Sequence, residues 1–345
     1  MRVAEHRTRT MWTLDRRARR HPPVGGGRNR PDHGYRGPGR AGRIGSMDQI
    51  ATSDAPAVRV RGLRKDYGGK AAVDGIDLDI GRGETFALLG PNGAGKSTTI
   101  EILEGYRLRT AGEVSVLGAD PAHGSLDWKA RIGIVLQSAA EPGRYTVREQ
   151  LAHFARFYPD PRDVDEVIAA VGLEPQARTR VAKLSGGQRR RVDVALGIIG
   201  RPELLFLDEP TTGFDPEARR EFWTLIRALK QEGTTILLTT HYLDEAAQLG
   251  DRAGVIVGGR LVEVAPIGEI GGAEARVPIV RWRDRDGVLR EERTERPAEL
   301  VAAVARDLGG DPDGLEVIRP SLEDIYLGMV GATGSVAPDD EEALA

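Results

Sequence analysis

A run of glycines followed by a lysine and two hydroxyl residues carries the clearest chemistry in this sequence. The run fits the spacing G-x4-G-K-[ST] and consists of Gly90, Pro91, Asn92, Gly93, Ala94, Gly95, Lys96, Ser97 and Thr98. Glycines at these positions let backbone N–H groups curl around a phosphate chain. The lysine supplies a cation for the terminal phosphates, and the serine hydroxyl can ligate Mg²⁺. The run predicts a site for ATP and Mg²⁺.

Two acids follow an apolar run further along the chain. Residues 204–207 are Leu-Leu-Phe-Leu, and Asp208 and Glu209 come directly after them. Asp208 can hold Mg²⁺ at the end of a strand, and Glu209 can orient or deprotonate a water molecule. Many buried strands end in acids, so this feature is weak alone. Together with the phosphate loop it indicates that the nucleotide is hydrolysed.

A serine and two glycines form a second candidate phosphate cradle. Ser185, Gly186, Gly187 and Gln188 follow Leu184 at the expected start of a helix, where backbone N–H groups favour anions. One ATP needs only one cradle. The second cradle makes sense if it serves a nucleotide held by another copy of the chain. The alternative is an ordinary helix cap.

The hydrophobic pattern around these motifs alternates between strands and helices. A continuous apolar strand, 85–89, precedes the phosphate loop, and a helix over about 96–104 follows it. Further strands are predicted at 59–65, 76–80, 114–117, 132–136, 204–207, 235–239, 255–257 and 261–264. Helices are predicted at about 188–199, 216–233 and 243–249, the second capped by Asp215 with Pro216 at its first position. This alternation predicts an α/β fold with a mostly parallel sheet, whose ligands lie at the carboxyl ends of the strands.

Two segments depart from this alternation. About 140–185 reads as a helical insertion within a domain spanning 57–271, with helices from Thr146, capped with Glu149, to about 158 and over about 164–171. Residues 272–331 predict a small α+β module. It would contain a hairpin (277–283 and 288–293) around Asp286-Gly287, a helix over 298–308, a strand over 315–318 and a helix over 322–330. We expect it to be dispensable for nucleotide binding.

The charge of the chain is unevenly distributed. Residues 1–46 hold 12 Arg and three acids, so they carry +9, and the net charge of −3 leaves −12 for the remainder. An acidic body argues against broad nucleic-acid binding. The Arg-, Gly- and Pro-rich head (1–46) and the acidic tail (332–345) lack apolar periodicity, so we expect both to be disordered. The break in composition favours Met47 as the true start, and a basic arm that touches nucleic acid or lipid is the alternative.

Composition excludes several classes of site. The chain has no cysteine, which excludes disulfides, thiolate metal sites and a cysteine nucleophile. No apolar run approaches the roughly 18 residues that a membrane-spanning helix needs.

From about Val58 to Ile270 the chain resembles the ATP-binding cassette (ABC) ATPases, a family of P-loop NTPases. The order of motifs carries the resemblance: phosphate loop, Gln137 at the end of a strand, Leu184 to Gln188, the Asp208-Glu209 strand and then His241. The resemblance implies an antiparallel β subdomain beside the parallel sheet. It implies that Gln137 touches Mg²⁺ and the water, and that His241 contacts the γ-phosphate. By the same resemblance Tyr67 stacks on adenine, and Gly213-Phe214-Asp215 forms the D-loop, where the family usually has Leu at the position of Phe214.

The segments 146–151 and 320–327 are similar to those of exporter ATPases of the daunorubicin-resistance type. This similarity implies an ATP-hydrolysing subunit that is peripheral on the cytoplasmic face of the membrane and exports a drug, lipid or similar substrate. Its partners would be a second copy of itself and a separate membrane permease, with no nucleic acid. The alternative is a soluble ABC ATPase that acts on ribosomes or nucleic acid. A regulatory module with a dead site is disfavoured because Lys96, Asp208, Glu209 and His241 are all present.

Overall fold

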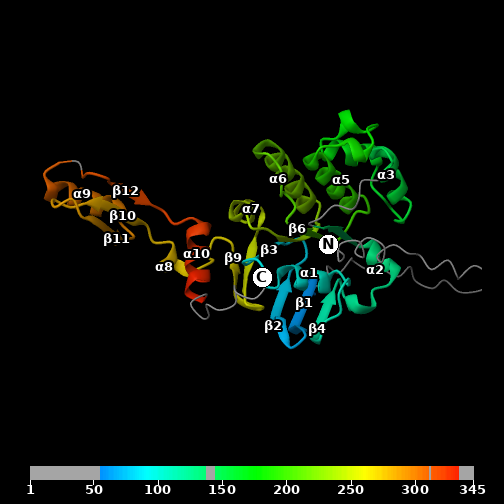
Figure 1. Ribbon diagram of the computed structural model, residues 1–345, viewed down its shortest axis with the longest axis horizontal. Coiled ribbons are helices and arrows are strands. Elements are labelled where there is room, and N and C mark those ends of the chain that lie inside the picture. The colour runs from blue at the N-terminus through cyan, green and yellow to red at the C-terminus, as the bar shows by residue number, and fades with distance from the viewer. Residues whose placement is uncertain (1–54, 137–143, 311, 334–345) are drawn as a thin grey trace, which may run out of the picture. The chain divides into compact units, whose positions relative to one another are not determined.

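The computed structural model describes residues 55–136, 144–310 and 312–333. Its central sheet contains, in order across the sheet, β5 (Ile132–Val135), β6 (Leu204–Asp208), β7 (Thr235–Thr239), β3 (Thr85–Leu89), β8 (Arg252–Val257) and β9 (Arg260–Pro266). Neighbouring strands from β5 to β8 run parallel, and β9 is antiparallel to β8. A second, antiparallel sheet has the order β2 (Lys70–Ile80), β1 (Val58–Tyr67) and β4 (Ala111–Val116). Both predicted sheets are confirmed (Figure 1).

The helices of the nucleotide-binding part begin close to the predicted residues. They are α1 (Lys96–Leu103), α2 (Leu126–Ala130), α3 (Val147–Ala155), α4 (Val164–Ala170), α5 (Gly186–Ile198), α6 (Pro216–Gln231) and α7 (Leu243–Leu249). The short helix α2 was not predicted, since five residues with a single buried Trp128 are too few to show a helical period. The last three helices of this part alternate with β6, β7 and β8, as the sequence predicts.

The two faces of the central sheet pack against different elements, because side chains alternate along each strand. On β3, Phe86 and Leu88 belong to a cluster with α1 and the antiparallel sheet, so α1 is packed by both sheets. Ala87 and Leu89 belong to a second cluster, which includes residues of α3, α4, α5, α6 and α7. The carboxyl ends of the strands are thus supported from both faces.

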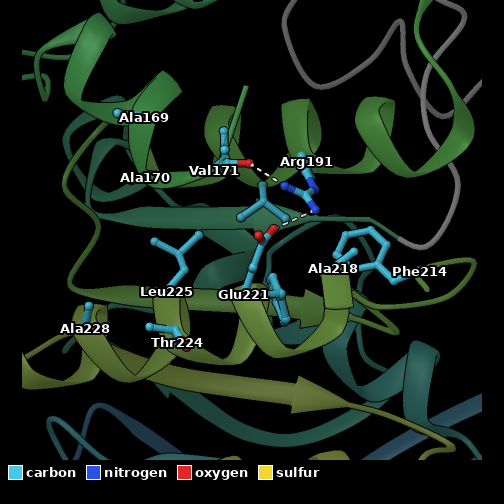
Figure 2. Close-up of a pocket in the computed structure, with 13 residues that line it drawn as sticks. Ala169, Ala170, Val171, Arg191, Phe214, Ala218, Glu221, Thr224, Leu225 and Ala228 are labelled. Carbon is cyan, nitrogen blue, oxygen red and sulfur yellow. Dashed lines mark hydrogen bonds and ion pairs between the residues drawn. The ribbon is translucent and has the colours of Figure 1, made fainter. Parts of the chain in front are cut away.

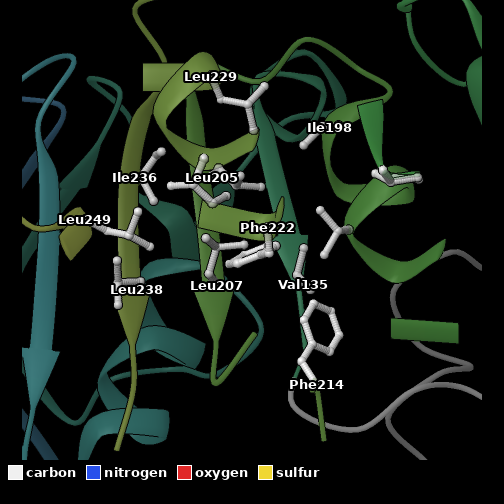
Figure 3. Packing of buried hydrophobic residues seen from close by; sticks show 14 of the residues in the cluster. Val135, Ile198, Leu205, Leu207, Phe214, Phe222, Leu229, Ile236, Leu238 and Leu249 are labelled. Carbon is white, nitrogen blue, oxygen red and sulfur yellow. The ribbon is translucent and has the colours of Figure 1, made fainter. Parts of the chain in front are cut away.

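The second cluster fixes the strand that carries the two acids. Leu205 and Leu207 of β6 are fully buried and lie in this cluster with Phe222 and Leu229 of α6 (Figure 3). Leu238 of β7 is also fully buried there. The end of β6 is therefore held by packing before any ligand binds.

The predicted helical insertion is present in the described residues from 144 onward. Thr146 begins α3 with a complete capping box, in which its side chain accepts from the Glu149 N–H and the Glu149 carboxylate accepts from the Thr146 N–H. Asp163 caps α4 by accepting from the N–H groups of Asp165 and Glu166. Both helix starts therefore follow from local sequence.

The C-terminal residues form a third sheet with helices. Its elements are α8 (Gly272–Ala275), β10 (Ile279–Arg283), β11 (Leu289–Arg293), α9 (Pro297–Leu308), β12 (Glu316–Ile318) and α10 (Leu322–Thr333), with strand order β11-β10-β12. The hairpin differs in detail from its prediction. Arg283 pairs with Leu289, so the loop spans 284–288 instead of closing as a two-residue turn. Gly287 has φ 76°, and its N–H donates to the Asp284 carbonyl, which accounts for the glycine.

Several predictions fall outside the described residues. These are the disordered head with its start at Met47, the acidic tail from 334 onward, and Gln137. No helix in the described part of the chain has the length and apolar character that a membrane crossing requires.

Candidate functional site

The phosphate loop connects the buried strand β3 to α1. Two of its glycines are required by packing, since a Cβ at Gly90 would lie 2.3 Å from the Ile256 carbonyl oxygen and one at Gly95 would lie 2.4 Å from that of Ala72. Gly95 also has φ 106°, which favours glycine. Gly93 has φ 76° and open space where a side chain would stand. The loop is therefore fixed at both ends and has room at Gly93.

Lys96 lies at the start of α1 with its amine buried in the loop. Its Nζ donates to the carbonyl oxygens of Gly90 at 2.6 Å and Pro91 at 3.0 Å. Burial lowers the pKa of Lys96, whereas the charges of Glu209 and Asp208 act to raise it. A phosphate chain in the loop would add a close anionic partner to this buried cation.

Asp208 ends β6 and is held by the neighbouring strand. The Thr239 hydroxyl of β7 donates to its Oδ1 at 2.5 Å. Burial raises the pKa of Asp208, the charge of Glu209 raises it further, and the Thr239 hydrogen bond opposes both. A bound divalent cation would favour the ionised carboxylate in this place.

Glu209 follows in a backbone conformation that is rare for its type. Its φ is 47°, in the left-handed region, and its N–H donates to the carbonyl and hydroxyl oxygens of Thr239, each at 3.1 Å. Non-glycine residues held there cluster at functional sites. The Oε2 atom of Glu209 lies 3.5 Å from the Nδ1 atom of His241, which follows β7. The structure thus brings together two of the predicted catalytic side chains.

Arg190 is a residue of this region that sequence reasoning missed. Its buried guanidinium donates to the carbonyl oxygens of Asp208 at 2.8 Å, Glu209 at 3.1 Å and Pro210 at 3.0 Å, and also to that of Leu136 after β5. Arg190 therefore ties α5 to the ends of β5 and β6. Its place four residues before the buried Val194 and eight before the buried Ile198 could have revealed it.

The second candidate cradle starts α5. The Ser185 hydroxyl accepts from the Gln188 N–H at 3.2 Å, and the Gln188 side chain accepts from the Ser185 N–H at 3.0 Å. This capping box matches the alternative interpretation of the motif, and it occupies the Gln188 side chain. Gly186 and Gly187 have open space around them, so a ligand can still approach their backbone.

The Gly213-Phe214-Asp215 segment precedes α6. Asp215 caps this helix by accepting from the Ala218 N–H at 2.8 Å. Phe214 is buried, with its ring edge-on to Phe222 at 6.0 Å, so the larger side chain is accommodated by packing. It also lines a cavity of about 420 Å³ between α4, α5 and α6, beside the Arg191–Glu221 ion pair of 2.8 Å (Figure 2). That cavity is lined by none of the loop residues 90–98.

Tyr67, the predicted adenine platform, ends β1 and is exposed. Lys65 Nζ lies 5.0 Å and Arg107 Cζ lies 5.3 Å from the centre of its ring. A base stacked on Tyr67 would share the ring with these cations, so the structure is compatible with stacking and with a surface role.

The described residues fit ATP and Mg²⁺. The first N–H groups of a helix have no partner within the helix, so the start of α1, directly after the loop, can donate to phosphate oxygens. Asn92, Gly93 and Ser97 are exposed along the loop, whereas Lys96 is buried. No group of three or more His, Cys, Asp or Glu side chains that could hold a metal occurs among the described residues, so an Mg²⁺ ion here would rely largely on phosphate oxygens, as Mg²⁺ commonly does.

Comparisons with known proteins agree with this geometry. The family model described as ABC transporter matches residues 73–212. The chain is 44% identical over 308 residues to the Nod factor export ATP-binding protein I of Rhizobium johnstonii, covering 87% of this chain and 90% of that protein. It is 42% identical over 286 residues to the daunorubicin/doxorubicin resistance ATP-binding protein DrrA of Streptomyces peucetius, covering 81% and 84%.

Solved structures show the same fold. An ATP-binding subunit of an ABC transporter aligns with a TM-score of 0.58 at 26% identity, covering 62% of this chain and 91% of that one. A dimeric ATP-binding cassette, MJ0796 bound to ADP and Pi, aligns with a TM-score of 0.56 at 24% identity, covering 61% and 98%. The extent and identity of the curated relatives decide the family. The chain belongs to the ATP-binding cassette ATPases of ABC transporters, and it binds and hydrolyses ATP.

Proposed function

We propose that this chain is the ATPase subunit of an exporter, working as a homodimer on a separate membrane permease at the cytoplasmic face of the membrane. The observation that carries the proposal is the convergence of the phosphate loop, Asp208, Glu209 and His241 on three adjacent strands. These residues lie at or just after the carboxyl ends of β3, β6 and β7, which are neighbours in the central sheet. The carboxyl edge of a parallel sheet is where such folds bind ligands.

In the proposed mechanism, the chain holds the triphosphate and activates a water molecule. Lys96 and the backbone N–H groups from Gly93 to Thr98 bind the phosphates. Ser97, Asp208 and Gln137 would hold Mg²⁺, which when bound neutralises charge on the phosphate oxygens. Glu209 takes the proton of the attacking water, and His241 orients the γ-phosphate beside it.

The second copy would complete each site. Ser185, Gly186 and Gly187 of one copy would contact the nucleotide held by the phosphate loop of the other. The open backbone at the two glycines supports this arrangement. The MJ0796 cassette has been solved as a dimer, which supports the same assembly for this chain.

The names of the relatives support export through a partner. One relative is named for Nod factor export and another for daunorubicin and doxorubicin resistance. We infer a substrate of that broad kind, a drug, lipid or similar amphiphile, recognised by the permease and not by this chain.

Co-expression tests the partnership. The chain would be expressed with a candidate permease, chosen as a membrane protein with six predicted spans, purified in detergent and assayed for phosphate release. The proposal predicts a complex that contains both proteins and loses its ATPase activity with Glu209→Gln in this chain. A soluble chain that never associates with that protein, yet associates with ribosomes, would favour the alternative function.

A further inference from the structure

The residue after His241 connects the proposed catalytic pair to helix α6. The ring centroid of Tyr242 lies 4.0 Å from that of His241, with the two planes tilted by 41°. The guanidinium carbon of Arg219 lies 4.2 Å from the centre of the same Tyr242 ring. Arginine stacks well on aromatic faces, and the contact gains strength where water is excluded.

Both residues of this contact are anchored by backbone hydrogen bonds. Arg219 lies in the first turn of α6, where its N–H donates to the Asp215 carbonyl at 3.0 Å. The Tyr242 N–H donates to the Thr240 hydroxyl at 2.9 Å, and its carbonyl accepts from the Glu245 N–H at 3.0 Å. The positions of the two side chains are therefore set by the starts of α6 and α7. A continuous series of contacts runs from Asp215 through Arg219, Tyr242 and His241 to Glu209.

A buried polar group lies beside the contact. Glu245 of α7 is 0% exposed, and the charge of Arg219 favours its ionised form, although burial raises the pKa of Glu245 overall. Side-chain donors of Thr211 and Trp223 also surround this carboxylate without reaching normal hydrogen-bond geometry. The Arg219 Nε is likewise buried without a hydrogen bond. Arg219 thus contacts the Tyr242 ring, and its charge acts on the buried Glu245 carboxylate.

We propose that Tyr242 and Arg219 are positioning residues that hold the His241 ring against Glu209. The His241 side chain is 44% exposed, so packing alone restricts its rotation little. The Tyr242 ring packs against the exposed His241 ring, and Arg219 of α6 holds the Tyr242 ring in place. Asp215 caps the start of α6, which carries Arg219. If a second copy displaced the Gly213-Phe214-Asp215 segment, the displacement would therefore reach His241 through Arg219 and Tyr242. The inference rests on the proposed roles of Glu209 and His241.

Steady-state kinetics of phosphate release test the pair. Tyr242→Ala should lower kcat about 5- to 30-fold, the equivalent of a lost cation–π contact of about 1–2 kcal/mol. KM for ATP should stay unchanged, because neither residue binds the nucleotide. Tyr242→Phe keeps the ring and should restore turnover, whereas Arg219→Met should behave like Tyr242→Ala. Arg220→Met removes the neighbouring exposed charge on α6 and should leave kcat unchanged.

The double variant Tyr242→Ala/Arg219→Met separates coupling from two independent effects. If both residues act through one shared contact, the double variant should turn over ATP no more slowly than either single variant. Multiplicative losses, a raised KM with normal kcat, or wild-type kcat in Tyr242→Ala would overturn the inference. If Tyr242→Ala fails to fold by circular dichroism, the comparison of Arg219→Met with Arg220→Met decides alone.

His241→Ala distinguishes the inference from the function beneath it. If His241→Ala is slow while Tyr242→Ala is normal, the positioning pair is wrong and the proposed site stands. If His241→Ala itself turns over like wild type, the proposed role of His241 is wrong, and the positioning inference is overturned with it.

Discussion

The Nδ1 atom of His241 lies 3.5 Å from the Oε2 atom of Glu209, although α6 and β7 separate the two residues in sequence. The pairing arises because β6 and β7 are parallel neighbours and end at the same edge. Glu209 adopts φ 47° there, with its N–H held by Thr239. Non-glycine residues held in this conformation cluster at functional sites, which supports the proposed catalytic role of Glu209.

Lys96→Ala should weaken ATP binding about 10- to 150-fold, because a hydrogen bond to a charged group contributes about 1.5–3 kcal/mol. The variant also frees the carbonyls of Gly90 and Pro91 that the amine now binds. Titration with a fluorescent ATP analogue measures the affinity. Lys129→Ala, an exposed lysine on α2, serves as the control and should bind ATP normally. Wild-type affinity in Lys96→Ala would show that the phosphate loop is misassigned.

Arg190→Met should reduce the free energy of unfolding by about 3 kcal/mol or more, since it leaves several buried carbonyl oxygens without a donor. Turnover should fall as well, because the backbone of Asp208 and Glu209 loses its support. Urea unfolding followed by circular dichroism gives the first quantity. The adjacent Arg189→Met should cost less than about 1 kcal/mol. Equal effects of the two substitutions would contradict the bridging role of Arg190.

Asp193 should make stability depend on pH. Burial raises the pKa of Asp193 to about 6 in the folded protein, above the usual value of 3.8. The folded state therefore binds this proton more tightly than the unfolded state, and this group's contribution to stability falls as pH rises from about 4 to about 6. Asp193→Asn should stabilise the protein at pH 7.5, with a gain that shrinks toward pH 4.5.

Thermal melts at the two pH values measure this gain. Asp307→Asn, whose side chain is 78% exposed, should show no such pH-dependent difference. If the stabilisation by Asp193→Asn grew as the pH fell, it would contradict a raised pKa of Asp193 in the folded protein.

Ile325→Ala should destabilise the chain by about 2–4 kcal/mol, as expected for a large core side chain cut to a methyl group. Ile325 of α10 is 4% exposed and packs in the same cluster as Leu249 of α7. Leu327→Ala, on the same helix but at a residue that is 59% exposed, should cost at most about 0.5 kcal/mol. Urea unfolding compares the two. Similar small effects would mean that α10 is not part of the core.

The packing of α10 bears on the predicted dispensability of residues 272–331. That prediction rests on the absence of motif residues beyond His241. A Cβ at Gly271 would lie 2.2 Å from Ile325, so the C-terminal helix covers the end of the ATPase domain. Removing it would expose apolar surface, and a clean test should keep α10. The role of β10 to β12 and α9 stays a prediction.

Local sequence specified the elements and much of the site. The phosphate loop, the apolar strand before Asp208 and the caps at Thr146, Ser185 and Asp215 each contain their own signal, and each structure follows it. Long-range contacts could not be derived in this way. Three consecutive arginines, 189 to 191, have the same chemistry, and only the packing of α5 makes the middle one a buried bridge.

The contact of Tyr242 with Arg219 shows the same limit. It joins the starts of two helices that are separated by β7, and no short motif records it. Likewise, nothing near Glu209 in the sequence indicates its positive φ, which depends on the neighbouring strand.

The central claim, that Glu209 acts on ATP in a site completed by a second copy, is tested most directly by light scattering of Glu209→Gln. This variant keeps the shape of the side chain but removes the base, so hydrolysis should slow about 10²- to 10⁴-fold while ATP still binds. Uncleaved ATP should then hold two copies together, because a ligand bound by the closed form stabilises it. We predict a monomer without nucleotide, a dimer at saturating ATP, and loss of that dimer when Ser185→Arg is added. A Glu209→Gln protein that stays monomeric at saturating ATP would contradict the shared site.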